Sequence, residues 1–595
     1  MVKNDTVEIF YACDEGFMKY LAVSLNSLIR HRDAKRDYNI HILCTSVGED
    51  MAAMLREMCP DGVNISFEKV CEGFSALEGR LPIRDYYSKT TYFRFLIPDC
   101  FPSVKKAIYI DADTVVREDI SRLYDTELSD FAVGACHEQV MVQTDVFGRY
   151  TEEVLGIDRM AFFNAGVMLI NCEQWRRLKI LERFTRLVGE YEFKVTQDED
   201  YLNVLLKDRV LFLDGRWNAE LAMRLDFPIG EAYILHYIMT AKPWHYGNCV
   251  GADFFYEEAS RTAVYDDIID TLSLYSDQMR ARDRLGEEKL KALAESEIRR
   301  EDGYLKGLMA KRSPDRLAIE EKIRQYERQG RFAEDVESDP PTLPLKPGEV
   351  DFLRKKLSSR IKQAYATMLA GSFLRKILKN GILRIRDIRG SESFASLRGG
   401  AVITCNHFNA LDSFAMHLAY KSSGHKRRKM YRVIREGNYT SFGGFYGKLM
   451  RNFYTLPLSS NHKVLKEFND AAGTVLKDGN FLLVYPEQSM WWNYRKPKPT
   501  QIGAFFIAAK NAVPILPIFI TMRDSETVGE DGYPIQEYTI HISNPIYPKS
   551  GYTYRENAEY MRQENDRVWR EIYEKEYGIP LTYTTEQRLE RAIGE

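Results

Sequence analysis

From residue 7 to about residue 246, short apolar runs alternate with stretches of helical periodicity. Short apolar runs bounded by polar residues are typical of buried strands, and their alternation with helices is typical of an α/β domain with a mostly parallel sheet. The predicted strands are residues 7–12, 40–44, 106–110, 166–170 and 210–213.

The pattern changes between about residues 266 and 332, where the chain is highly charged and helix-prone. We expect solvated connecting helices there, for example at residues 286–297 and 318–329. Residues 335–348 follow, and their prolines predict a stiff, extended linker and a domain boundary. These prolines are Pro340, Pro341, Pro344 and Pro347.

Residues 351–389 are rich in lysine and arginine, and apolar residues recur every four positions along one face of the helix that we expect there. A basic amphipathic helix favours an anionic membrane surface, where each nearby Lys or Arg adds about 1 kcal/mol. A helix that packs on the core and keeps a solvated cationic face is the alternative. The apolar face consists of Leu353, Leu357, Ile361, Tyr365 and Leu369.

From residue 399 onward strand-like runs again alternate with helices, so we expect a second α/β domain. The predicted strands are residues 401–405, 481–485, 515–520 and 538–542. The predicted organisation is a first domain at residues 1–260, a charged helical and proline-rich linker at residues 261–349, and a second domain at residues 350–595 that begins with the basic helix.

Composition restricts the class of protein further. A chain of 595 residues is too long for one hydrophobic core, and a formal net charge of -3 argues against a nucleic-acid partner. Nine scattered cysteines without a CxxC pair indicate reduced thiols, and we see no signal peptide, so we expect a cytoplasmic protein. The longest apolar stretch, residues 502–521, is interrupted by Lys510 and Pro514, so we expect membrane contact to be peripheral.

Two carboxylates directly follow one predicted strand. Asp111 and Asp113 come after the apolar run at residues 107–110, and in open α/β sheets ligands gather beyond the carboxyl ends of the strands. Two hard oxygen ligands one residue apart can hold a Mg²⁺ or Mn²⁺ ion that bridges a nucleotide diphosphate. An isolated pair of this kind is more often part of a turn or a solvated loop.

The surroundings of this pair resemble glycosyltransferase family 8, the retaining lipopolysaccharide-galactosyltransferase and glycogenin-like enzymes, over about residues 7–246. The resemblance implies a Rossmann-like, nucleotide-sugar-binding domain of GT-A type that uses a UDP-sugar with Mn²⁺ or Mg²⁺. The blocks that carry it, in order, are residues 9–14, 88–98, 109–113, 164–166, 198–203, 217–218 and 236–244.

The same resemblance implies roles for particular side chains. The metal ligands are Asp111, Asp113 and His236. The residues that contact the nucleotide and its diphosphate are Ala12, Asp14, Arg94 and Lys242. The residues that face the donor sugar and the reacting carbon are Asn164, Asp198 and Glu199.

Two positions depart from the family 8 pattern. Glu199 stands where the family usually carries glutamine, and Met239 stands where it usually carries glycine. A glycine at that point lets the backbone approach phosphate closely. Met239 therefore affects the expected phosphate contact, while the set of metal ligands is intact.

A histidine and an aspartate stand five residues apart after the predicted strand at residues 401–405. At a strand-to-helix turn, Asp412 can reach one ring nitrogen of His407 while the other faces a substrate hydroxyl. A histidine oriented in this way can take the proton as the hydroxyl attacks a thioester, an effect usually worth roughly 10² to 10⁴ in rate. In isolation such a pair is more often structural.

Further blocks make residues 399–547 similar to the lysophosphatidate acyltransferase-like, or glycerolphosphate acyltransferase, superfamily. The resemblance implies catalytic roles for His407 and Asp412, an acyl-CoA or acyl-carrier-protein donor, and contact of Glu487 and nearby cations with the acceptor's polar head. The four motifs are His407 with Asp412, residues 442–458, the block beginning at residues 485–487, and residues 513–517.

This second copy departs more from its family than the first. The usual Glu-Gly-Thr-Arg reads Glu487-Gln488-Ser489-Met490, and the arginine expected near residues 454–457 is missing. Nearby cations can bind phosphate instead, with Arg495 as the substrate-binding candidate, and a solvated loop is the alternative. These cations are Arg495, Lys496 and Lys498.

Together the two halves predict a bifunctional transferase, peripheral at the inner face of the cell membrane, that builds a glycolipid or a cell-envelope glycan. Its expected partners are a UDP-sugar, acyl-CoA or acyl-carrier protein, a lipid or glycan acceptor and an anionic membrane surface. One alternative is an active glycosyltransferase with a non-catalytic, membrane-docking acyltransferase-like domain. Another is a scaffold for other envelope enzymes.

Overall fold

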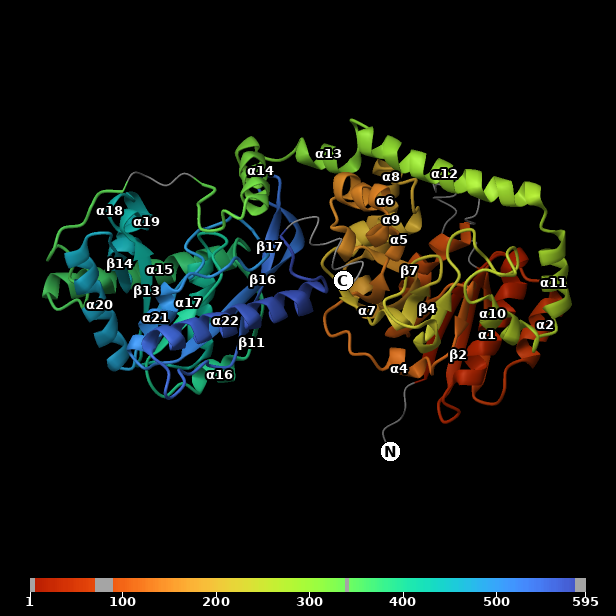
Figure 1. Ribbon diagram of the computed structural model, residues 1–595, viewed down its shortest axis with the longest axis horizontal. Helices are drawn as coiled ribbons and strands as arrows, with labels where there is room; N and C mark the ends of the chain where they lie inside the picture. The colour runs from red at the N-terminus through yellow and green to blue at the C-terminus, as the bar shows by residue number, and fades with distance from the viewer. Residues whose placement is uncertain (1–5, 70–88, 338–341, 584–595) are drawn as a thin grey trace. The chain divides into compact units, whose positions relative to one another are not determined.

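The computed structural model describes residues 6–69, 89–337 and 342–583. Of the residues that the motifs above include, Ser88, Pro340 and Pro341 lie outside this description. The chain divides after Ala310 into two compact units, here called unit 1 and unit 2, and each has its own sheet (Figure 1).

Unit 1 is built on a seven-stranded sheet that contains every strand predicted for it. Strands β1 to β4 are parallel, and β7 runs antiparallel to its neighbours β4 and β6. In sheet order the strands are β3 (Val63–Lys69), β2 (Tyr38–Cys44), β1 (Val7–Ala12), β4 (Lys106–Ile110), β7 (Phe163–Asn171), β6 (Val133–His137) and β8 (Val210–Phe212).

Helices bury both faces of this sheet, which is why its strands read as continuous apolar runs. Along β1, Ile9 and Tyr11 enter one core while Phe10 and Ala12 enter the other. The main helices of unit 1 are α1 (Met18–His31), α2 (Glu49–Glu57), α5 (Gln139–Gln143), α6 (Asp145–Tyr150), α7 (Cys172–Arg177), α8 (Ile180–Glu190), α9 (Asp198–Leu205), α10 (Ala252–Ala259), α11 (Tyr265–Leu274) and α12 (Asp277–Arg299).

A small second sheet brings a histidine to the strand ends of unit 1. β10 (Ile234–His236) lies between β5 (Thr114–Val116) and β9 (Ala219–Glu220). His236 pairs with Thr114 on one side and Glu220 on the other. Because β5 begins one residue after Asp113, this pairing fixes His236 next to the two predicted carboxylate ligands.

The charged stretch after residue 260 is helical, as the sequence predicts, and most of its side chains are exposed or half-buried, but one face of α12 packs on unit 1. Helix α12 runs along α6 (Figure 1) and buries Ala294 completely in the core of unit 1. Leu345, inside the proline-rich segment, is likewise buried in a core of unit 2. A few apolar residues at helical spacing are enough to pack a mostly charged segment, and a hydropathy pattern dominated by charge hides them.

Unit 2 also has a seven-stranded sheet, and every strand predicted for it is present. All neighbouring strands are parallel except β16 and β17, which run antiparallel. In sheet order the strands are β11 (Arg384–Arg389), β17 (Pro534–Ile542), β16 (Ile515–Val528), β12 (Ala401–Thr404), β15 (Phe481–Val484), β13 (Met430–Arg435) and β14 (Thr455–Leu458). The main helices are α14 (Pro314–Arg328), α15 (Leu357–Lys379), α17 (Asp412–Ser422), α19 (Gly444–Asn452), α20 (His462–Lys477), α21 (Gly503–Lys510) and α22 (Tyr554–Tyr577).

The predicted basic helix is α15, and it is shorter than the basic stretch that suggested it. Arg354 precedes the helix and is buried, where its guanidinium donates to the Arg451 carbonyl at 3.0 Å. The last basic residues of the stretch, residues 384–389, form strand β11. Over the residues that the structure describes, no helix is both long enough and apolar enough to span a bilayer.

Two positions where the related families carry glycine have a left-handed backbone here. Met239 has a φ of 58° and Gln488 a φ of 60°. This conformation costs a side-chain-bearing residue roughly 1–2 kcal/mol because Cβ crowds the following carbonyl oxygen. The fold therefore keeps the conformation that suits glycine at both positions, although the residues have changed.

We predict that Gln488→Gly raises the free energy of unfolding of unit 2 by up to about 1 kcal/mol, measured by urea unfolding. Gln488 is exposed, so the substitution removes strain without removing core packing. As a control, Gln563→Gly lies on an exposed position inside α22 and should lower stability by about 1 kcal/mol. A loss of stability in Gln488→Gly would contradict the strain argument.

Candidate functional sites

A cavity of about 810 Å³ lies at the strand ends of unit 1. Every residue that the sequence predicted for the nucleotide-sugar site lines it, so the structure brings the whole set together. These residues are Ala12, Asp14, Arg94, Asp111, Asp113, Asn164, Asp198, Glu199, His236 and Lys242.

The predicted metal ligands converge on one point in this cavity. Asp111, Asp113 and His236 each offer a ligand atom, and these atoms all lie within 4.8 Å of one another. His236 Nε2 is 3.3 Å from Asp113 Oδ1 and 3.9 Å from Asp111 Oδ2. Two carboxylates and an imidazole form a donor set that suits Mn²⁺, and Mg²⁺ through its oxygens.

Gly166 leaves the space among these ligands open. A Cβ atom at this position would lie 2.3 Å from His236 Cε1 and 2.8 Å from Asp111 Oδ2. Any side chain there would clash with two of the three ligands. The residues present therefore fit a metal ion in both donor chemistry and room.

Asn218 orients the histidine ligand. His236 Nδ1 lies 2.9 Å from Asn218 Oδ1, and Asn218 Nδ2 donates to Asn164 Oδ1 at 2.8 Å. Since the Asn218 oxygen can only accept, Nδ1 carries the proton and the Nε2 lone pair faces the carboxylates. The sequence marked Asn218 as part of a family block but gave it no role.

Lys242 lies within the ligand cluster and not at a distance from it. Its Nζ donates to Asp113 Oδ2 and to the Tyr237 carbonyl. Burial raises the pKa of Asp113, but the charges of Lys242 and His236 outweigh burial and hold that pKa below its ordinary value. The ammonium group is thus positioned next to the oxygens that a diphosphate would approach.

Arg94 connects the ligand cluster to the predicted catalytic residues. It is 3% exposed, and its guanidinium lies 3.2 Å from Asp111 Oδ1 and 3.2 Å from Asp198 Oδ2. Burial raises the pKa of Asp198 to about 6, against the opposing effect of Arg94. Arg94 is therefore a buried counter-ion for two carboxylates, as well as a predicted nucleotide contact.

Glu199 is half-buried and lies near two fully buried carboxyls, those of Glu138 and Glu220. Glu199 accepts a hydrogen bond from the Ala165 amide at 2.6 Å, and Glu220 accepts one from the Gln139 amide at 3.0 Å. Burial raises the pKa of Glu199, and the nearby Glu138 raises it further, well above its ordinary value. This favours the neutral acid, which has the shape of a glutamine side chain and one donor group. The departure from the family glutamine is therefore a small one chemically.

In unit 2 the predicted catalytic pair is formed. His407 Nδ1 lies 2.5 Å from Asp412 Oδ2, and the Asp412 side chain is 1% exposed while that of His407 is 25% exposed. His407 follows β12, and Asp412 is the first residue of α17. The strand-to-helix turn thus holds the carboxylate beneath the imidazole and leaves one edge of the ring accessible.

Glu487 is buried below this pair and does not face the solvent. It accepts hydrogen bonds from the His407 amide at 2.9 Å and the Lys498 amide at 2.8 Å. Lys498 Nζ lies 3.2 Å from Glu487 Oε2, and both side chains are almost fully buried. This arrangement fixes the His407 loop, so the position of Glu487 favours a structural contribution over direct contact with a substrate.

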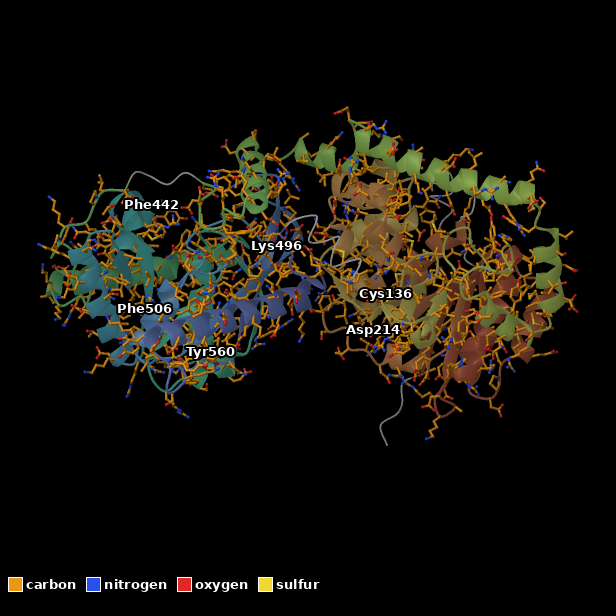
Figure 2. The ribbon with its side chains drawn as sticks, in the orientation of Figure 1. Cys136, Asp214, Phe442, Lys496, Phe506 and Tyr560 are labelled. Atoms are coloured by element: carbon orange, nitrogen blue, oxygen red, sulfur yellow. The ribbon has the colours of Figure 1, made fainter. Side chains whose placement is uncertain are left out.

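The other cations of this segment also have carboxylate partners. Arg495 lies 2.7 Å from Asp524 Oδ1, and Lys496, labelled in Figure 2, lies 2.5 Å from Glu327 Oε1. A freely solvated loop is therefore not what the segment forms. Contact of Arg495 with a substrate remains a prediction that requires it to leave Asp524 or to share it.

Arg432 supplies a buried cation that sequence reasoning missed. It lies on β13 and pairs with Thr455, which belongs to the segment where the family arginine was expected. Burial lowers its pKa to about 10, and its guanidinium lies 4.7 Å from the centre of the Phe453 ring. An arginine within a strand gives no motif signal, so only the register of β13 and β14 shows that Arg432 lies beside this segment.

We predict that the buried Asp198 makes unit 1 less stable as the pH rises. Its pKa is 3.8 when unfolded and about 6 when folded, so the folded state binds the proton more tightly and loses stability between about pH 4 and pH 6. The loss is at most about 3 kcal/mol. Urea unfolding in the presence of a chelator should show it as a pH-dependent difference between the wild type and Asp198→Asn. The exposed Asp61→Asn should follow the wild type, and identical pH profiles for all three proteins would contradict the prediction.

Two family models match separate parts of the chain. The model described as glycosyl transferase family 8 matches residues 8–248, and the model described as acyltransferase matches residues 385–521. The first range contains the three converging ligands, and the second contains the His407 and Asp412 pair. Both resemblances drawn from the sequence are confirmed.

Three similar proteins each match less than half of this chain. General stress protein A of Bacillus subtilis is 28% identical over 267 residues, which are 41% of this chain and 90% of that protein. Lipopolysaccharide glucosyltransferase WaaO of Escherichia coli is 27% identical over 264 residues, which are 41% of this chain and 74% of that protein. Among solved structures, galactosyltransferase LgtC with donor and acceptor sugar analogues is 27% identical, with a TM-score of 0.37 over 43% of this chain and 96% of that one.

The matched ranges lie in different units, and each contains the site that its resemblance predicted. The chain therefore joins a family 8 glycosyltransferase domain to an acyltransferase domain.

Proposed function

We propose that unit 1 transfers a sugar, with retention, from a UDP-sugar to an acceptor, and that unit 2 transfers an acyl group from acyl-CoA or acyl-carrier protein to a hydroxyl. The products belong to glycolipid or cell-envelope glycan biosynthesis. The convergence of Asp111, Asp113 and His236 inside one cavity is the observation that carries the proposal.

In unit 1, Mn²⁺ or Mg²⁺ would supply positive charge to the departing diphosphate. Asp111, Asp113 and His236 would hold the ion, and Lys242 places an ammonium group beside Asp113. Preorganised charge of this kind is effective because it needs no reorganisation during the reaction. The residues that orient the donor sugar are Asn164, Asp198 and Glu199, which line the same cavity.

In unit 2, His407 is the general base. Asp412 holds the Nδ1 proton, so Nε2 can take the proton of an acceptor hydroxyl as its oxygen attacks the thioester carbonyl. The tetrahedral adduct then breaks its C–S bond, and the proton passes to the leaving thiolate. The products are an ester and a free thiol, and no covalent enzyme intermediate is required.

A second candidate function treats unit 2 as an inactive docking module for the glycosyltransferase. The changed third motif favours it, because Ser489 and Met490 replace the family's threonine and arginine. The intact His407 and Asp412 contact opposes it. Release of free CoA from acyl-CoA by the full chain, absent in His407→Ala, would decide for acyl transfer.

We predict that the two activities can be removed separately. Asp113→Ala should abolish Mn²⁺-dependent turnover of UDP-sugars and leave acyl transfer unchanged, because the variant lacks one metal ligand. His407→Ala should lower acyl transfer by roughly 10² to 10⁴ and leave UDP-sugar turnover unchanged. A chelator should reproduce the first pattern only. Each variant is the control for the other. The assignment would be refuted if both variants turned over the UDP-sugar and the acyl donor at wild-type rates.

The apolar residues at the start of α15 support peripheral membrane binding. Leu357 is 73% exposed and Ile361 is 62% exposed, and Tyr365 and Met368 continue the same stripe. Lys355, Lys356, Arg360 and Lys362 are exposed around this stripe. Exposed apolar side chains between cations suit an anionic lipid surface, which offers both an acyl region and negative charge.

We predict that replacing Leu357 and Ile361 together with Gln weakens co-sedimentation with phosphatidylglycerol-containing vesicles about tenfold or more. The loss follows from the apolar burial that each side chain gains in the bilayer, about 1.5–3 kcal/mol at most. Leu274→Gln changes an equally exposed leucine of unit 1 and should bind as the wild type does. Undiminished binding of the double variant would refute a membrane role for this helix.

A further inference from the structure

Tyr485 lies beside the catalytic histidine because two neighbouring strands end together. It follows β15, which is the parallel neighbour of β12, and Val484 pairs with Thr404. The loop that carries His407 leaves the adjacent strand end. The Tyr485 ring stacks on the imidazole, with ring centres 4.3 Å apart and an angle of 23° between the planes. The stacking limits rotation of the imidazole.

The Tyr485 hydroxyl also binds the oxygen of Asp412 that His407 leaves free. The hydroxyl donates to Asp412 Oδ1 at 2.9 Å, while His407 Nδ1 is 2.5 Å from Oδ2. Because the Asp412 side chain is 1% exposed, protein groups have to satisfy both of its oxygens. Each oxygen therefore has one protein donor, and the two donors fix the plane of the carboxylate.

Ser413 extends this network by one member. Its Oγ lies 2.9 Å from the Tyr485 hydroxyl oxygen. Since the one phenolic proton is donated to Asp412, the serine is the donor in this contact. Burial raises the pKa of the Tyr485 hydroxyl well above its ordinary value, and Asp412 raises it further. The hydroxyl thus stays protonated where a histidine base operates.

We infer that Tyr485 is a positioning residue for acyl transfer, which holds the Asp412 carboxylate and the imidazole so that His407 Nε2 faces the acceptor hydroxyl. Among the described residues no protein group bonds this Nε2. The inference rests on the proposed acyl transfer. The sequence assigned Tyr485 only to the start of a motif, and no spacing rule connects it to Asp412.

Tyr485→Phe tests the inference because it keeps the stacked ring and removes only the hydroxyl. The kcat of acyl transfer should fall about tenfold, the factor that a hydrogen bond of ordinary net strength accounts for. The KM for the acyl donor should change less than kcat.

With one donor fewer, the carboxylate holds more charge and favours the protonated imidazole. The acidic limb of the kcat/KM profile should therefore move to higher pH. The other ionisable groups near the pair are Cys405, Arg432, Glu487, Lys498 and Tyr538, and the substitution leaves them in place.

Three comparisons separate positioning from a general loss of structure. Ser413→Ala should change kcat and the acidic limb of the kcat/KM profile in the same directions, but by less. Tyr554→Phe, at an exposed position of α22, should behave as the wild type. In a His407→Ala background Tyr485→Phe should cause no further loss. Two results would overturn the inference. One is a wild-type kcat and pH profile in Tyr485→Phe. The other is a loss of acyl transfer in the His407→Ala background as large as the loss that Tyr485→Phe causes by itself.

A spectroscopic measurement tests the contact without relying on turnover. The proton shared between His407 and Asp412 should give a far-downfield resonance in the full chain, absent in His407→Ala and displaced in Tyr485→Phe. Absence of acyl transfer in the wild type, with this displacement present, would reject the proposed function but not the contact. An undisplaced resonance would overturn the positioning role.

Discussion

A carboxylate removed from water has to be met by a cation or by hydrogen-bond donors, and both sites of this protein are arranged around that requirement. In unit 1, Arg94 lies between two such carboxylates, and Lys242 and His236 meet a third at Asp113. In unit 2, Asp412 is enclosed by two donors from different segments. Removal of a partner would leave a buried charge or acceptor with fewer donors, so the partners favour one fixed placement of each group. Rigid placement is also what a catalytic group needs, so the demands of stability and of chemistry coincide here.

The sheets decide where this buried charge can lie. Parallel strands end at a common edge, and backbone groups and side chains that leave those ends come together. In unit 1 the edge after β4 receives His236 from a second small sheet, and in unit 2 the ends of β12 and β15 lie side by side. The two domains differ in fold family and chemistry, yet each places its reacting groups by the same geometric rule.

The departures from family patterns have a common physical character. Met239 and Gln488 replace glycines but keep the left-handed backbone, so the local path of the chain is retained with some strain. Glu199 replaces glutamine, and its burial beside Glu138 favours the neutral acid that resembles an amide. In each case the surroundings preserve the property that the family residue supplied. The residues of a motif can therefore be substituted while its backbone conformation or hydrogen-bonding pattern persists.

The sequence by itself predicted nine of the strands, the two-domain α/β character, one candidate set of metal ligands and one candidate catalytic pair. It could do so because buried strands must be apolar and because chemistry at a strand end follows the strand directly in the chain, as Asp111 and His407 do. Only the tertiary structure decided which separate segments meet. It gave His236 its partner Asn218, joined Tyr485 to Asp412, and packed the charged helix α12 onto unit 1. Those contacts join residues from segments that pair or pack only in the folded chain, so no local pattern of polarity or spacing records them.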